Sequence, residues 1–197
     1  VPASIVSANA TVVQLRAGSS LARTGHVELV GTTGARISAV GAWTYASPGQ
    51  ILSVEPGSGQ IGTRVTIAGT GLRSASSDVS EVLLGSVPAQ VLSANDSVVI
   101  VSCADGPASN TAENVTVVGT GGGFAVATRA FTFLEKGAIG VVEPSEGQLG
   151  TRITLQGERL LGGGAQLATA HVGGAVAQVV SANATQVVLR AGGAVSG

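Results

Sequence analysis

Short runs of alternating apolar and polar residues cover much of this 197-residue chain. In residues 63–68, Thr63, Val65 and Ile67 share one face and the alternate residues take the other. This period of two predicts a half-buried β-strand. The same pattern, or a run of β-branched residues, predicts further strands at residues 97–103, 114–118 and 124–134. Glycine clusters separate these runs and no stretch has a helical apolar stripe, so we predict an all-β protein.

An internal repeat organises the chain. Residues 54–72 read VEPGSGQIGTRVTIAGTGL and residues 142–160 read VEPSEGQLGTRITLQGERL, so 11 of the 19 positions match at an offset of 88. A third copy is visible earlier in the chain, where Ala42-Trp43-Thr44-Tyr45 aligns with Ala130-Phe131-Thr132-Phe133 at the same offset. A fixed offset of this kind is typical of tandem structural units.

The repeat divides the chain into three parts with a period of about 88 residues. We expect residues 1–46 to be the back part of one unit, residues 51–135 a complete unit, and residues 139–197 the front part of a third. Partial units expose unpaired strand edges, which proteins normally cover. The favoured explanation is a piece of a longer chain. The alternative is that the partial units complete each other between molecules, by strand exchange or head-to-tail addition.

Each complete unit has the strand content of a small immunoglobulin-like β-sandwich. About seven short strands with turns every 8–12 residues fit that architecture. The aligned aromatic pairs, Trp43 with Tyr45 and Phe131 with Phe133, are expected to fill the sandwich cores. The linkers at residues 46–50 and 134–138 are short, which predicts a stiff rod with neighbouring units in contact.

The repeated opening of the units resembles the start of an IPT/TIG domain. Its residues are Val54-Glu55-Pro56, Gly59, residues 62–67, Gly69 and Leu72, and residues 142–160 match equally well. The resemblance implies tandem immunoglobulin-like β-sandwich repeats, as found in plexins, related receptors, extracellular repeat proteins and some transcription factors. It implies a fold and a set of contexts and no single activity.

Composition excludes several classes of protein. The chain has 30 Gly, one Cys, 11% charged residues and a net charge of −1. Ten scattered basic residues without stacking aromatics argue against a nucleic-acid partner. No apolar run is long enough for a membrane span. A single Cys cannot form an internal disulfide, so Cys103 is either a buried free thiol or a candidate intermolecular disulfide.

Four of the five asparagines begin an N-x-Ser/Thr sequon: Asn9, Asn95, Asn114 and Asn183. Three of them, Asn9, Asn95 and Asn183, occupy the same place in their units. Asparagine before a strand is also an ordinary turn residue. A repeated sequon in an exposed turn nevertheless suits N-glycosylation, so we predict N-linked glycans and a secreted protein.

Catalytic, cofactor and metal sites are not predicted. His26 and His171 fall at different places in their units and have no partner at metal-ligand spacing. Glu135 and Glu143 flank one linker and leave interdomain Ca²⁺ as an alternative. The glycine run at residues 119–123 lacks the lysine and the following helix of a phosphate-binding loop, so we expect a hairpin turn there.

The favoured function is a non-catalytic structural or adhesive segment of a large secreted or cell-surface repeat protein. A subunit of an extracellular filament or of a surface or flagellar hair fits within that interpretation, because small uncharged faces pack without desolvating ions. Its expected partners are other copies of the chain or neighbouring repeats. The alternatives are a ligand-binding receptor ectodomain and an accessory domain of a polysaccharide-active enzyme.

Overall fold

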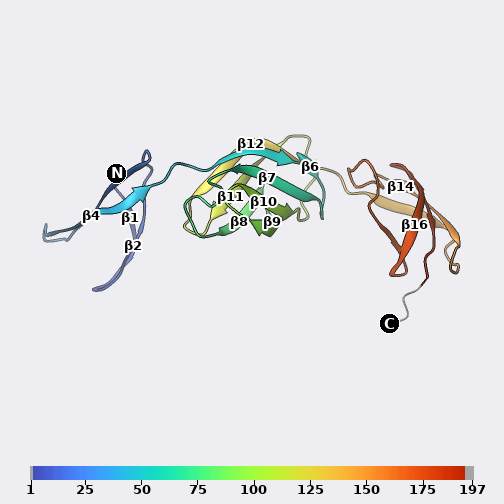
Figure 1. Cartoon of the computed structure of the whole chain (residues 1–197), viewed down its shortest axis with the longest axis horizontal. Coiled ribbons are helices and arrows are strands. Elements are labelled where there is room, and N and C mark those ends of the chain that lie inside the picture. The colour runs from blue at the N-terminus through green and yellow to red at the C-terminus, as the bar shows by residue number, and fades with distance from the viewer. Residues whose placement is uncertain (1, 194–197) are drawn as a thin grey trace.

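The protein is built from strands gathered in three bodies. A computed structural model describes residues 2–193, and these residues form strands β1–β17 and no helix. The bodies lie in a row along the long axis of the molecule (Figure 1). We call β1–β4 the first unit, β5–β12 the middle unit and β13–β17 the third unit. The predicted all-β class is confirmed. Val1 and residues 194–197, which the predicted first and third units include, lie outside the described residues.

The middle unit is a β-sandwich whose sheet order is β5-β7-β10-β9-β8-β11-β12-β6. All its pairings are antiparallel except that of β6 with β12. Within this unit, Val65 and Ile67 are fully buried, so the alternation at residues 63–68 is confirmed. Its strands are β5 (Gln50–Glu55), β6 (Ser58–Gly59), β7 (Arg64–Thr70), β8 (Val79–Leu84), β9 (Val87–Ala94), β10 (Val98–Ser102), β11 (Glu113–Gly119) and β12 (Phe124–Phe133).

The third unit repeats the front half of the middle unit. Its sheet order, β13-β14-β17-β16-β15, is that of β5-β7-β10-β9-β8 at an offset of 88. Ile153, Val187 and Leu189 belong to its small buried core. Its strands are β13 (Ala138–Glu143), β14 (Arg152–Glu158), β15 (Ala170–Val172), β16 (Ala175–Ala182) and β17 (Gln186–Arg190).

The first unit repeats the back half of the middle unit as two separate hairpins, β1–β2 and β3–β4. Trp43 and Tyr45 keep the edge-on geometry of Phe131 and Phe133, but Trp43 is 46% exposed. The expectation that Trp43 fills a core is therefore wrong for the described residues, because no opposing sheet covers this hairpin among them. The strands are β1 (Ser4–Ala8), β2 (Val13–Arg16), β3 (Arg23–Val30) and β4 (Arg36–Tyr45).

Left-handed backbone positions follow the repeat. The four non-glycine residues with positive φ each align, at the offset of 88, with a glycine of positive φ in another unit. L-residues pay a steric penalty in this region and glycine does not. The fold therefore demands the left-handed conformation at these places whichever residue occupies them. The pairs are Ser74 with Gly162, Ala75 with Gly163, Arg129 with Gly41, and Arg159 with Gly71.

Candidate functional sites

Three of the four sequons lie in one repeated hairpin turn. In the turn between β9 and β10, Asn95 Oδ1 accepts backbone hydrogen bonds from Ser97 and Val98, both at 2.8 Å. Asn9 between β1 and β2 and Asn183 between β16 and β17 accept the same two bonds at 2.7–2.9 Å. These are Asx turns, in which the side chain hydrogen-bonds backbone N–H groups of the loop. A backbone bond closes each loop as well, because the N–H of each asparagine donates to the carbonyl oxygen three residues later at 2.8–2.9 Å.

The chemistry of these turns is compatible with modification. All three asparagines are exposed, and the turn engages only the oxygen of each side-chain amide. An N-linked glycan joins the amide nitrogen, so the turn and a glycan do not compete for the same atom. In the turns of Asn9 and Asn183 the hydroxyl of the sequon also donates to Oδ1, at 3.1 and 3.2 Å from Thr11 and Thr185.

The fourth sequon has a different setting. Asn114 lies in β11, and its Oδ1 accepts a hydrogen bond from the backbone N–H of Arg129 at 3.1 Å. The β11–β12 register is irregular between Glu113 and Val115, opposite this contact. The Asn114 side chain thus braces the bulge around Arg129, where φ is +52°. In the first unit Gly41 takes the place of Arg129 and provides the same conformation without such a brace.

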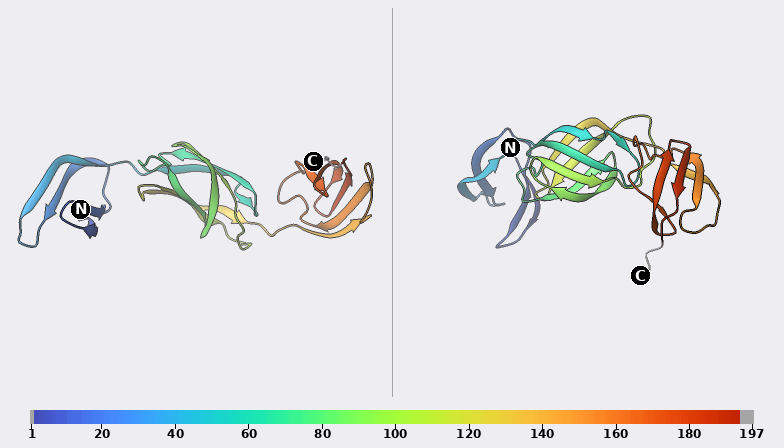
Figure 2. Two further views of the ribbon diagram at one scale, coloured as in Figure 1. Left: turned by 90° about the horizontal axis from the view of Figure 1, so that it is seen from below. Right: turned by 45° about the vertical axis from the view of Figure 1, so that its right-hand side comes forward.

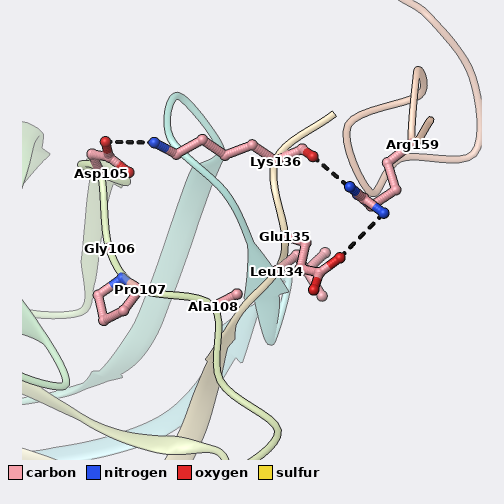
Figure 3. A pocket seen from close by; sticks show the side chains of 8 residues that line it. All are labelled: Asp105, Gly106, Pro107, Ala108, Leu134, Glu135, Lys136 and Arg159. Atoms are coloured by element: carbon pink, nitrogen blue, oxygen red, sulfur yellow. Dashed lines mark hydrogen bonds and ion pairs between the residues drawn. The ribbon is translucent and has the colours of Figure 1, made fainter. Parts of the chain in front are cut away.

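A charged cluster holds the joint between the middle and third units. Lys136 Nζ donates to Asp105 Oδ2 at 2.6 Å, and Arg159 Nε donates to the Lys136 carbonyl oxygen at 2.9 Å (Figure 3). The Arg159 guanidinium also pairs with Glu135 and with Glu158, each at 3.1 Å. Asp105, Glu135, Lys136 and Arg159 border an open pocket of about 640 Å³. Because the ion pairs are exposed, each contributes little to stability on its own. Together they fix the geometry of the joint between the middle and third units.

The joint between the first and middle units lacks this cluster. At the offset of 88, Gly71 stands in place of Arg159 and Pro48 in place of Lys136. The linkers are equally short, residues 46–49 and 134–137 between flanking strands. Sequence reasoning did not predict a role for Arg159. The signal was an arginine at the position where the middle unit has Gly71, close to the chain's one lysine.

The Cys103 side chain lies in the core of the middle unit and is 2% exposed. Burial raises the pKa of the thiol, so the thiol stays protonated at neutral pH. This favours the buried free thiol of the two alternatives. An intermolecular disulfide would require the end of β10 to leave the core, and it stays a prediction for non-reducing electrophoresis to test.

The remaining polar candidates do not converge. His26 lies in β3 and His171 in β15, in different units, so the structure brings them to no common site. Glu135 forms an ion pair with Arg159, which argues against its binding an interdomain Ca²⁺. Within residues 2–193, no three His, Cys, Asp or Glu side chains are placed to share a metal ion. The described part of the chain also has no helix that is long and apolar enough to cross a membrane.

Comparison with known proteins finds one family model that matches the middle unit. A model of the IPT/TIG domain matches residues 50–133. No curated protein matches the chain. Among solved structures, the plexin A4 extracellular region is similar in two crystal forms. One, with domains 1 to 10, has a TM-score of 0.56 at 21% identity and covers 98% of this chain and 18% of its own.

Two further structures are similar at lower scores. The second plexin A4 structure has a TM-score of 0.48 at 18% identity, over 78% of this chain and 16% of its own. A Bacteroides ovatus SGBP-B in complex with a mixed-linkage heptasaccharide has a TM-score of 0.36 at 16% identity, over 93% of this chain and 46% of its own. This chain spans less than a fifth of the length of either plexin chain. The likeness to the plexin A4 structure with domains 1 to 10 shows a shared fold.

Proposed function

Because a model of the IPT/TIG domain matches residues 50–133, we propose that this chain is a non-catalytic structural segment of a secreted or cell-surface repeat protein. The observation that carries the proposal is the serial arrangement of repeated β-sandwich units on four-residue linkers, residues 46–49 and 134–137. Linkers this short leave neighbouring units little freedom to separate. The function is passive: the folded units in series keep a fixed length, and their outer faces are exposed to the surroundings.

The bonding of the second joint supports this role. Lys136 and Arg159 connect the linker to both neighbours, and Gly137 N donates to Gln60 Oε1 of the middle unit at 3.0 Å. A linker that only tethered two independent domains would not need side-chain bonds to each of them. The proposal therefore expects a fixed orientation of the third unit relative to the middle unit. The joint at Pro48, between the first and middle units, is expected to be less restrained.

The three Asx turns support an extracellular location. Each places a sequon asparagine in the same exposed hairpin turn, and a chain with only 11% charged residues gains solubility from attached glycans. We propose glycans at Asn9, Asn95 and Asn183, and at Asn114 as the fourth sequon. Intact mass should fall on enzymatic removal of N-glycans from protein isolated from its native source. An unchanged mass, with all four asparagines recovered unmodified in peptides, would reject the glycan proposal.

Electron microscopy of the native material tests the structural role. The proposal expects extended particles, or a regular polymer whose axial repeat is related to the length of one unit. Compact single particles, or particles whose middle and third units take every relative angle, would contradict it. Peptide mapping of the same sample identifies the chain that was imaged, so a negative image cannot be assigned to another protein.

A further inference from the structure

The sequon turn of Asn183 lies beside the linker that joins the middle and third units. The backbone N–H of Leu160 donates to the carbonyl oxygen of Ala184 in this turn at 2.9 Å. The residue before Leu160 is Arg159, whose Nε donates to the Lys136 carbonyl oxygen in the linker at 2.9 Å. Two hydrogen bonds on neighbouring residues therefore connect the sequon turn to the joint.

The middle unit repeats this arrangement at the joint with the first unit. The N–H of Leu72 donates at 3.0 Å to the carbonyl oxygen of Asp96, which lies in the turn of Asn95. The carbonyl oxygen of the neighbouring Gly71 approaches Gly49 of the linker so closely that a Cβ on Gly49 would collide with it. Asn95 is exposed in the middle unit, which has both of its sheets, so the exposure of this turn belongs to the unit itself.

The strand register explains why the turn lies at a joint. The middle unit lies between the other two, and each linker leads into the first strand of the next unit (Figure 2). Gln50, the first residue of β5, is opposite Thr70, and Ala68 is opposite Val98, the first residue of β10. The β9–β10 turn therefore lies at the end where the chain enters the unit. The third unit repeats both pairings at the offset of 88.

We propose that the glycans on Asn95 and Asn183 are joint glycans, which lie over the linker and shield it from proteases. The inference rests on the glycosylation proposed above. At the second joint, the surface that receives the sugars is the open pocket bordered by Asp105, Lys136 and Arg159 (Figure 3). The Asp105 and Lys136 side chains are each 55% exposed, so they can still exchange hydrogen bonds with sugar hydroxyls.

The linkers are the segments that most need a cover. Residues 46–49 and 134–137 form no strand, so they lack the paired backbone that protects their neighbours. Exposed segments of this kind are the preferred sites of proteolytic cleavage. One glycan beside each linker gives a physical reason for a sequon that recurs at the same place in successive units.

A protease that cleaves only after lysine tests the shield at one bond. Lys136 is the chain's one lysine, so this enzyme cuts the chain only between Lys136 and Gly137. The chain is secreted from eukaryotic cells that add N-glycans, and occupancy of Asn183 is read from peptide masses. Thr185→Ala removes this sequon and keeps both backbone bonds of the Asx turn. It should speed cleavage at least about five-fold, because the bond is then open to the enzyme.

Two controls separate the glycan from other effects of the substitution. Ser97→Ala removes the sequon of Asn95 at the other joint and should leave the cleavage rate unchanged. Unglycosylated wild type and Thr185→Ala, both made in bacteria, should be cut at the same fast rate. Equal rates for glycosylated wild type and Thr185→Ala, or equal acceleration by Ser97→Ala, would overturn the joint glycan. An unmodified Asn183 in the secreted wild type would instead reject the glycosylation on which it rests.

Discussion

Replacing Phe131 with alanine should destabilise the middle unit severely. Phe131 is fully buried on β12, and its ring packs edge-on against Phe133 with the centroids 5.3 Å apart. Truncation of a buried phenylalanine costs about 3–5 kcal/mol. At about 0.05–0.15 kcal/mol per residue, a domain as long as residues 50–133 unfolds with a free energy of about 4–13 kcal/mol. The variant therefore loses at least about a fifth of the stability of the unit.

The single cysteine provides the assay. Cys103 is buried in the same core, so pulse labelling of the thiol against guanidinium concentration follows the unfolding of the middle unit alone. With a slope of about 2 kcal/mol/M, the loss lowers the midpoint by about 1.5–2.5 M. Phe124→Ala is the matched control, because Phe124 lies on the same strand and is 61% exposed; it should change stability by less than about 0.5 kcal/mol. Equal losses in the two variants, or an unchanged midpoint for Phe131→Ala, would refute the assignment of the core.

Three further predictions use the same chain. Gly62→Ala should cost about 1–2 kcal/mol in the thiol assay, because φ is +83° there while the space around a Cβ is open; an unchanged midpoint would contradict this. Arg159→Gly, which copies Gly71 of the first joint, should broaden the angles between the middle and third units in electron micrographs and leave the thiol midpoint unchanged; an unbroadened distribution would argue against the charged joint. Raising the pH above the ordinary pKa of a thiol should lower the stability measured by circular dichroism. Burial raises the pKa of Cys103, so the thiol loses its proton at a lower pH in the unfolded chain than in the folded one. The Cys103→Ala variant should not lose stability in this way, and an equal loss in the variant would exclude the thiol as the cause.

The strands of the middle unit could be predicted because burial of one face imposes a period of two on the sequence. Val65 and Ile67 face the core, and the residues between them face outward. The repeat carried this reading to the third unit, where Ile153 occupies the place of Val65 and is also buried. Local pattern and tertiary burial agree at these positions, which is the condition under which a sequence reading succeeds.

Features that depend on partners distant in sequence could not be predicted. The alignment of Trp43 with Phe131 indicated a core residue, but burial also needs an opposing layer, and none covers Trp43 within residues 2–193. Lys136 and Arg159 are 23 residues apart with β13 and β14 between them, so no local pattern encodes the hydrogen bond from Arg159 to the Lys136 carbonyl oxygen. The only sign of this contact in the sequence is that Arg159 stands where the middle unit has Gly71.

The sequons show what a motif leaves undetermined. The same three-residue pattern occurs in a hairpin turn at Asn95 and within a strand at Asn114. In the turn the asparagine closes a local loop, and in the strand it braces a bulge formed by Arg129. The sequon specifies the residues that N-glycosylation requires. Whether the asparagine lies in a turn or in a strand decides the structural role of its side chain.

Immunogold labelling of intact, unpermeabilised cells from the native source is the most direct test of the proposed extracellular structural role. An antibody against the middle unit should label the outside of these cells, with gold particles in rows along extended structures. Labelling that appears only after permeabilisation, or that stays scattered without linear order, would contradict the account.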